Sequence, residues 1–150
     1  MKKIILYGLL TAGLLAIPVK RADVGNLRPV EVVLIYQEDN QICMRTDTDD
    51  GGSGENIHKA LQNMLDASLG VIYLDTAKYL LLTDEVQDVA QEMRTYLDAD
   101  VQLCVTEPGV DLKMMAQYLG VHGKLPQLGS WKPGQVLPLV TIGNGKIKMS

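Results

Sequence analysis

The stretch TDTDDGGSGENIHKAL, residues 46–61, is where the chain changes from strand-like to helix-like periodicity. The residues before it are apolar and rich in β-branched side chains, whereas apolar residues after Glu55 recur at helical spacing. This change of period predicts a fold that mixes strands with helices. The stretch also contains aspartates, glycines and His58, so its residue types raise the question of a binding site.

A β-hairpin is expected directly before this stretch. The runs RPVEVVLIYQ (residues 28–37) and QICMRTDT (residues 41–48) are both typical of strands. The residues between them, Glu38, Asp39 and Asn40, are turn formers. The two runs are therefore predicted to pair with each other as antiparallel strands.

A helix is expected directly after the stretch. Its apolar positions begin at Ile57, and Gly70 provides a stop signal. We expect Leu61 and Leu65 to lie on the face that packs against a sheet, together with Ile57 and Met64. The residues expected to face solvent are His58, Lys59, Gln62 and Asn63.

The rest of the chain alternates strands and helices. Strands are predicted at residues 78–82 and 101–107, helices at residues 86–97 and 112–119, and a closing hairpin around Asn144-Gly145. The complete order is β-β-α-β-α-β-α-β-β. It predicts an α/β (α+β) fold in which a mixed β-sheet carries about three packed helices.

The spacing of the 46–61 stretch fits neither a calcium loop nor a phosphate loop. A calcium loop of the EF-hand type starting at Asp47 would place Gly51 at a position that needs an oxygen ligand. It would also place His58 where a bidentate acid is required. A phosphate loop would need lysine and a hydroxyl residue after Gly54, and none follows there.

The start of a helix explains the same residues without a ligand. Glycine permits the turn from strand to helix, Ser53 is a suitable helix cap, and Glu55 complements the helix dipole. We therefore predict no metal, cofactor or catalytic residues in this stretch.

The histidines and cysteines do not form a recognisable motif. His58 and His122 are too far apart in sequence for a zinc pattern. Cys43 and Cys104 each lie inside a predicted strand, which favours two buried, inert thiols. A disulfide between them is the alternative, and a cysteine–histidine pair that meets only in space also stays open.

Charge and composition restrict the class of partner. The chain has 150 residues and a net charge of −4, with no long basic run. This argues against nucleic acid as a partner. The length suits one domain, which we place at residues 21–150.

The first twenty residues are typical of a signal sequence or an N-terminal membrane anchor. Lys2 and Lys3 precede an apolar run from Ile4 to Ile17, which has the length of an export signal. The run is shorter than the roughly 20 apolar residues of a membrane span. Ala16 is a poor cleavage position, so both a cleaved signal and an anchor stay open at residues 1–20.

The order of short motifs resembles that of a known family. RADVGNLRPVEVVLI (residues 21–35) is similar to the family's charged stretch and first strand, and IYLDTAKYLLLTDE (residues 72–85) to a later turn and strand. LPLVTIGNGKI (residues 137–147) resembles a late proline-led strand. GENIHKAL (residues 54–61) matches a glycine-led helix, G-x-T-I-x-E-A-L, at Gly54, Ile57, Ala60 and Leu61.

The family is the Ger(x)C spore germination family, the C subunits of germinant receptors, and the resemblance is to its N-terminal domain. The place of the family's lipobox cysteine falls near Pro18, so we expect export without lipidation. The resemblance implies a cell-envelope protein of sporulation and germination. It also implies a binding or scaffolding role rather than catalysis, with envelope or membrane proteins as partners.

The sequence thus predicts an exported, non-enzymatic envelope domain that acts by contact with proteins or a membrane surface. The alternatives are a small-molecule-binding or enzymatic α/β domain of unknown substrate, and a structural module. A pocket with convergent polar groups would favour the small-molecule alternative. An exposed apolar surface or a bare sheet edge would favour surface contact.

Overall fold

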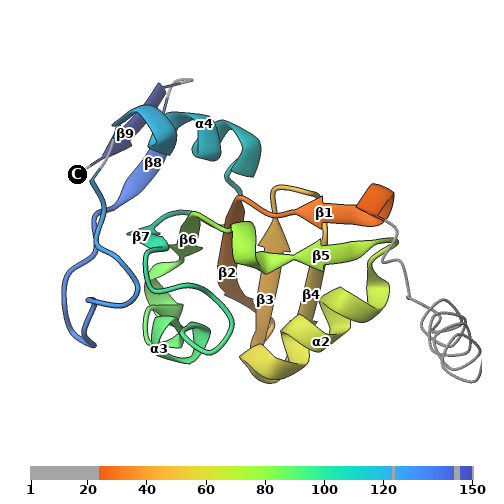
Figure 1. Cartoon of the computed structure of the whole chain (residues 1–150). Helices are drawn as coiled ribbons and strands as arrows, with labels where there is room; N and C mark the ends of the chain where they lie inside the picture. The colour runs from red at the N-terminus through yellow and green to blue at the C-terminus, as the bar shows by residue number, and fades with distance from the viewer. Residues whose placement is uncertain (1–23, 123, 144–145, 150) are drawn as a thin grey trace, which may run out of the picture.

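The computed structural model describes residues 24–122, 124–143 and 146–149, and its centre is a five-stranded mixed sheet (Figure 1). The strand order is β4-β3-β2-β6-β7. Antiparallel pairing joins β4 to β3 and β3 to β2, whereas β2, β6 and β7 run parallel. The strands are β2 Val32–Glu38, β3 Gln41–Thr46, β4 Gly51–Gly54, β6 Tyr79–Leu82 and β7 Gln102–Val105. The predicted class, a mixed sheet with helices packed on it, is confirmed.

The predicted β2–β3 hairpin forms around a two-residue turn. Asp39 and Asn40 have φ values of 49° and 61°, and Glu38 pairs with Gln41. Asp and Asn adopt this left-handed conformation more readily than other non-glycine residues. The turn that they form matches the natural twist of paired strands, so a local sequence signal sets the register of the hairpin.

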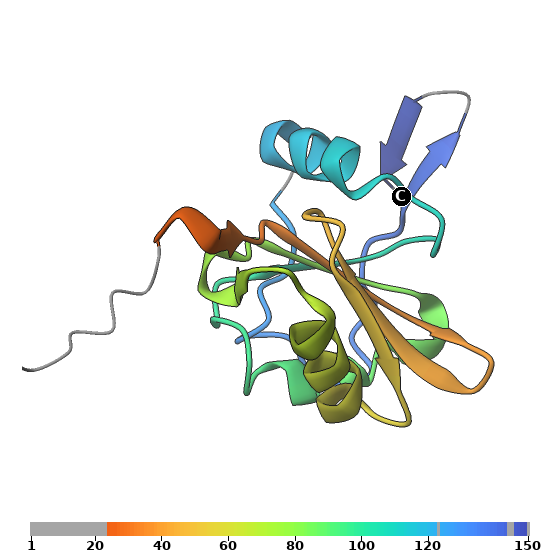
Figure 2. The same cartoon turned by 90° about the vertical axis from the view of Figure 1, so that its right-hand side faces the viewer.

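Helices cover both faces of the sheet (Figures 1 and 2). Helices α2 Ile57–Ala67 and α3 Val89–Met93 pack on one face, and α4 Leu112–His122 packs on the other. Successive residues of β2 alternate between these faces: Val33 and Ile35 join the α2–α3 side, while Val32 and Leu34 join the α4 side. Burial on both faces explains why the first four residues of β2, Val32 to Ile35, are all apolar.

Two details of the predicted helices are wrong. The helix expected over residues 86–97 is a short 3₁₀ turn, η3 Asp84–Val86, followed by the brief α3. Leu61 is buried as expected, but Leu65 is 45% exposed. At 3.6 residues per turn, Leu65 lies about 90° from the centre of the buried stripe, which Met64 occupies.

Two small sheets flank the central one. The predicted closing hairpin is present as β8 Val140–Gly143 and β9 Lys146–Met149, and its expected turn at residues 144–145 lies outside the described residues. The second small sheet was not predicted. It pairs β1 Leu27–Pro29 in parallel with β5 Val71–Tyr73. The 3₁₀ turn η1 Val24–Asn26 directly precedes β1, and the 3₁₀ turn η2 Leu74–Thr76 directly follows β5.

The outer edge of β7 is covered by the loop that precedes β8. The backbone N–H of Leu103 donates to the carbonyl of Pro126 at 2.8 Å, and that of Val105 donates to the carbonyl of Pro138 at 2.9 Å. Trp131, in the same loop, is fully buried and donates its indole N–H to the carbonyl of Gln135 at 3.2 Å. The loop therefore completes the core on this side.

Residues 1–20, the expected signal sequence or anchor, lie outside the described residues. Within the part of the chain that the structure describes, no helix has the length and apolar character needed to cross a bilayer.

Candidate functional site

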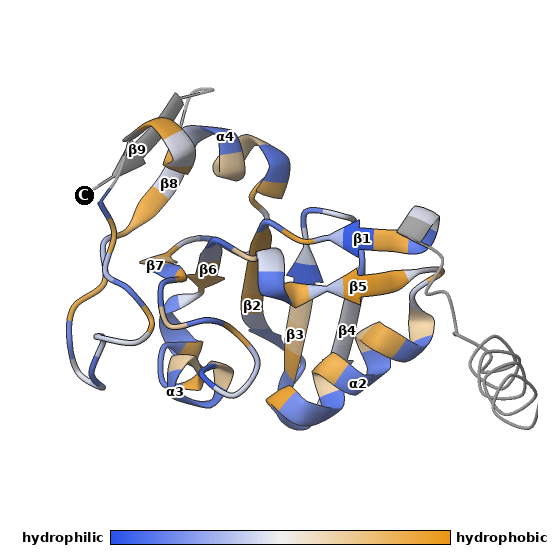
Figure 3. Ribbon diagram, in the orientation of Figure 1, coloured by the Kyte–Doolittle hydropathy of each residue, from blue (hydrophilic) through white to orange (hydrophobic). Residues whose placement is uncertain are grey.

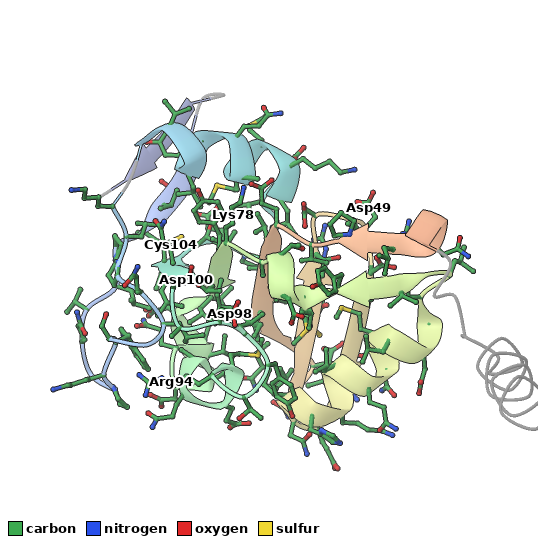
Figure 4. All side chains as sticks on the ribbon, viewed as in Figure 1. Asp49, Lys78, Arg94, Asp98, Asp100 and Cys104 are labelled. Atoms are coloured by element: carbon green, nitrogen blue, oxygen red, sulfur yellow. The ribbon has the colours of Figure 1, made fainter. Side chains whose placement is uncertain are left out.

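The first two aspartates of the 46–61 stretch, Asp47 and Asp49, both contact other parts of the fold. Asp47 Oδ1 accepts hydrogen bonds from the backbone N–H groups of Glu31 and Val32, at 3.0 and 3.1 Å, at the start of β2. Asp49 is exposed and forms an ion pair with Lys113 at 3.0 Å (Figure 4). Among the described residues, no group of three acidic, histidine or cysteine side chains is arranged to hold a metal ion.

Asp50 is buried and joins three segments of the chain. Its carboxylate accepts a hydrogen bond from Arg28 Nη1 at 2.7 Å, from Thr48 Oγ1 at 2.7 Å and from Ser68 Oγ at 3.0 Å. These partners belong to β1, to the β3–β4 connection and to the end of α2. Asp50 therefore has a structural role, because its acceptor sites are occupied by groups of the protein itself.

The glycines of the stretch form an edge strand, β4, rather than the turn that the sequence predicts. Gly52 pairs with Met44 of β3. A Cβ at Gly52 would lie 2.4 Å from the carbonyl oxygen of Ala60 and 2.4 Å from the backbone nitrogen of Met64. The backbone of α2 therefore rests directly on β4, an approach that only glycine allows.

The cap of α2 also differs from the prediction. The side-chain oxygen of Asn56 accepts a hydrogen bond from the backbone N–H of Lys59 at 2.9 Å, as an N-cap residue does. Ser53, the predicted cap, lies within β4 and its carbonyl accepts from the Asn63 side chain at 2.7 Å. The 46–61 stretch thus contains a strand and the start of a helix, and several of its polar groups form hydrogen bonds within the fold.

The histidines do not build a site in the described structure. His58 is exposed on α2, and its ring nitrogen Nδ1 lies 3.2 Å from the hydroxyl of Tyr96. The side chain of His122 lies outside the described part of the chain.

The cysteines are free and cannot pair in this fold. Cys43 lies on β3 and Cys104, labelled in Figure 4, lies on β7, and the strand order places β2 and β6 between them. Three strand spacings amount to about 14 Å, twice the largest Cα separation that a disulfide allows. Burial raises the pKa of the Cys104 thiol to about 12, and burial also raises the pKa of Cys43. The disulfide alternative is therefore excluded, and neither thiol has the lowered pKa of a nucleophile.

An exposed apolar surface lies on the small β1–β5 sheet, close to where the described chain begins. Figure 3 shows apolar residues on both of these strands. Leu27 pairs with Val71, and Pro29 pairs with Tyr73, so these side chains share one side of the two strands. All four are exposed. Leu69, two residues before β5, is 97% exposed. We call this surface, made of Leu27, Pro29, Leu69, Val71 and Tyr73, the β1–β5 face.

The opposite side of β1 and β5 fixes this small sheet to the domain. Ile72 is buried in the same core cluster as the apolar residues of α2. The backbone N–H of Val30 donates to the carbonyl of Tyr73 at 3.2 Å, and Thr76 Oγ1 donates to the carbonyl of Val30 at 3.0 Å. A Cβ at Gly70 would lie 2.6 Å from the carbonyl of Asn26, so β5 starts in close contact with the chain before β1. The β1–β5 face is therefore held rigidly toward solvent.

A second surface feature lies at the carboxyl ends of the parallel strands. Two adjoining hollows, of about 580 Å³ and about 260 Å³, share Asp84, Val105 and Leu139 as lining residues. We call the two hollows together the carboxyl-end cleft. Ligands of open α/β sheets are commonly bound in this position.

No protein-family model, curated protein or solved structure matches the chain. The resemblance to the Ger(x)C family therefore stays a prediction, and function has to be argued from the β1–β5 face and the carboxyl-end cleft.

Sequence reasoning missed both surfaces for a common reason. Leu27 and Val71 belong to three-residue strands, which are too short to show a period of two. The cleft collects residues that follow separate strands. The sequence signal for the β1–β5 face is the short alternation L-R-P at residues 27–29 and V-I-Y at residues 71–73. These residues form one surface only because the two strands pair with each other.

Proposed function

We propose that the chain is an exported, non-enzymatic domain of the cell envelope that works at the membrane surface, held there by residues 1–20 as an uncleaved anchor. The β1–β5 face is the surface that contacts the bilayer. The observation that supports this role is the position of an exposed apolar surface beside the amino-terminal end of the described chain.

The distance along the chain favours a bilayer as the occupant of this face. Six residues, 18–23, separate the apolar run that ends at Ile17 from Val24. Fully extended, the chain from Ile17 to Val24 spans about 25 Å, and Leu27 follows only three residues later. A bilayer that holds the apolar run therefore lies within reach of the β1–β5 face.

The chemistry of the face agrees with an interfacial position. Leu69 and Val71 supply aliphatic surface, while Tyr73 joins an apolar ring to a polar hydroxyl, the combination that is enriched where membranes meet water. Lys20 and Arg21 follow the apolar run, and with Asp23 they leave one net positive charge between it and the domain. That charge favours anionic lipid headgroups.

Quenching by brominated lipid tests the contact directly on the full chain. Trp131 is the single tryptophan and is buried, so a tryptophan introduced at the surface reports its own surroundings. On vesicles of brominated phosphatidylcholine, we expect Leu69→Trp to lose most of its added emission. Val136→Trp is the matched control, because Val136 is also apolar and 88% exposed but lies in the loop before β8.

Equal quenching at the two positions, or quenching at neither, would contradict contact through the β1–β5 face. If the emission of the tryptophan at position 69 is not quenched on vesicles but changes when envelope proteins are added, the face contacts a protein partner instead. The anchor itself is tested by the intact mass of the protein from host membranes. We expect the complete chain without a diacylglyceryl group; a mass lacking residues 1–20 would rule out the anchor.

The role in germination is the most specific part of the proposal, and it is supported by the resemblance to the Ger(x)C family. We expect genes for other germinant-receptor subunits, or for sporulation proteins, beside the gene for this chain. An unrelated gene neighbourhood would remove the germination role and leave the membrane contact to be decided by the quenching experiment.

A further inference from the structure

The carboxyl-end cleft lies at the end of the molecule where three parallel strands stop. Because β2, β6 and β7 run in the same direction, the residues that follow them meet at one edge of the sheet. Gln37 lies near the end of β2, Thr83 and Asp84 follow β6, and Glu107 lies just after β7. All four line the smaller hollow.

The charge of the cleft has one sign. Its lining includes Asp84, Glu85 and Glu107 and contains no lysine, arginine or histidine. None of the three acids forms an ion pair with a described residue. Asp84 is held in place by Gln87, whose side-chain nitrogen donates to Asp84 Oδ1 at 2.7 Å. The cleft therefore repels anions and favours a positively charged group.

Thr83 provides an independent indication of a ligand. It lines the smaller hollow, is only 4% exposed, and its hydroxyl oxygen has no hydrogen-bond partner in the described structure. Buried hydroxyls nearly always have a partner, so an unpaired one calls for an explanation, and a functional role is one such explanation. Turning this hydroxyl toward a ligand breaks no existing hydrogen bond. The neighbouring Thr106 differs, because its hydroxyl donates to the carbonyl of Val140 at 2.8 Å.

The remaining wall of the cleft is apolar. Val105 and Leu139 line both hollows, and Val136 and Leu137 add to the larger one. A ligand that fits this lining needs a cationic, hydrogen-bonding head and an aliphatic body. Metal ions fit poorly, since no three acidic side chains in the described residues are grouped as ligands.

We propose that the carboxyl-end cleft binds an organic cation, a protonated amine on a short aliphatic body. The ammonium group lies beside the Asp84 carboxylate, in the field of the nearby Glu85 and Glu107, and donates to the hydroxyl of Thr83 once that hydroxyl turns toward it. The aliphatic body lies against Val105 and Leu139. This site is separate from the β1–β5 face and does not depend on membrane contact.

Titration of the full chain with hexylamine tests the proposal, with hexanoate as a probe of the same body and opposite charge. At neutral pH and low salt we expect hexylamine to bind with a Kd of about 1 mM or tighter, and hexanoate to show no saturation. Asp84→Asn, which keeps the size of the side chain, should weaken hexylamine binding about tenfold.

Two variants separate a specific site from general attraction. Asp100→Asn makes the same charge change at the opposite end of β7 and should leave the Kd unchanged (Figure 4). Thr83→Val keeps the shape, removes the unpartnered hydroxyl and should weaken binding several-fold without lowering the unfolding midpoint in urea. The proposal is wrong if hexanoate saturates at the same concentration as hexylamine. It is also wrong if hexylamine does not saturate, or if Asp100→Asn weakens binding as much as Asp84→Asn.

Discussion

The 46–61 stretch and the β1–β5 face differ in how far the fold uses their chemistry. The stretch contains aspartates, glycines and a histidine, the residue types from which binding sites are made, yet its polar groups are engaged by the protein itself. Asp50 accepts from three side chains, and Gly52 holds a helix at contact distance. The β1–β5 face contains ordinary residues such as Leu69 and Val71, which nothing in the described structure covers.

This difference shows that residue type alone is a weak guide to function. A carboxylate with full hydrogen bonding inside the fold has no capacity left for a ligand. An apolar side chain held toward water on a fixed strand has interaction free energy still to gain. The same criterion separates the two threonines of the carboxyl-end cleft, since Thr106 is bonded and Thr83 is not.

The largest expected effect comes from the helix that rests on the 46–61 stretch. Leu61→Ala removes a buried side chain between α2 and the sheet and should lower the free energy of unfolding by about 2–5 kcal/mol. Leu65→Ala on the same helix, at a 45% exposed position, should cost less than about 1 kcal/mol. Urea unfolding of both variants measures the two costs. Similar losses of unfolding free energy for the two variants would mean that α2 packs against the sheet through a different face of the helix.

The close approach of α2 to β4 gives the next effect. Gly52→Ala places a Cβ against backbone atoms of Ala60 and Met64 that cannot rotate away, so we expect a loss of about 3 kcal/mol. Gly109→Ala is the control, because a Cβ there meets nothing within 4 Å. It should be neutral, or stabilising by less than about 1 kcal/mol. The test is denaturant unfolding of both variants. If Gly52→Ala lowers the free energy of unfolding no more than Gly109→Ala does, α2 does not pack against β4 at contact distance.

Local signals were enough to predict the centre of the fold. The turn at Asp39-Asn40 and the alternating faces of β2 follow from short-range geometry, so the hairpin and the mixed sheet could be read from the sequence. The length of α3 could not, because the apolar stripe of residues 86–97 continues through 3₁₀ and irregular turns. Periodicity records which residues are buried and does not record whether the backbone between them is helical.

Tertiary pairing produced what the sequence did not show. Glycine is a poor strand former, so β4 exists because β3 offers it an edge and α2 needs its bare backbone. The β1–β5 face joins residues 27 and 71, and the carboxyl-end cleft joins the ends of three strands. Both candidate surfaces are properties of contacts between distant segments, for which the sequence holds only fragments.

A smaller effect is expected at the aspartates. Asp50→Asn removes the charge that faces Arg28 and replaces one acceptor by a donor against Thr48 and Ser68, so we expect a loss of about 2 kcal/mol. Asp49→Asn breaks only an exposed ion pair with Lys113 and should change stability by less than about 0.5 kcal/mol. The measurement is the unfolding midpoint of each variant at constant salt. An equal response of the two aspartates would show that Asp50 is not the internal hub that its contacts describe.

The smallest effect is expected at His58, and it decides how the whole 46–61 stretch is interpreted. His58 is exposed and its one described contact is the Tyr96 hydroxyl at 3.2 Å, so His58→Ala should cost less than about 0.5 kcal/mol. Tyr96→Phe removes the hydroxyl that His58 contacts. The free-energy cost of the double variant should equal the sum of the two single costs less the energy of this one hydrogen bond, which both single variants remove. A histidine that served as a ligand or as the centre of a polar network would instead cost as much as Leu61 when removed. Urea unfolding of the three variants distinguishes these cases, and a large loss at His58 would turn the stretch from a fully satisfied structural element into a site.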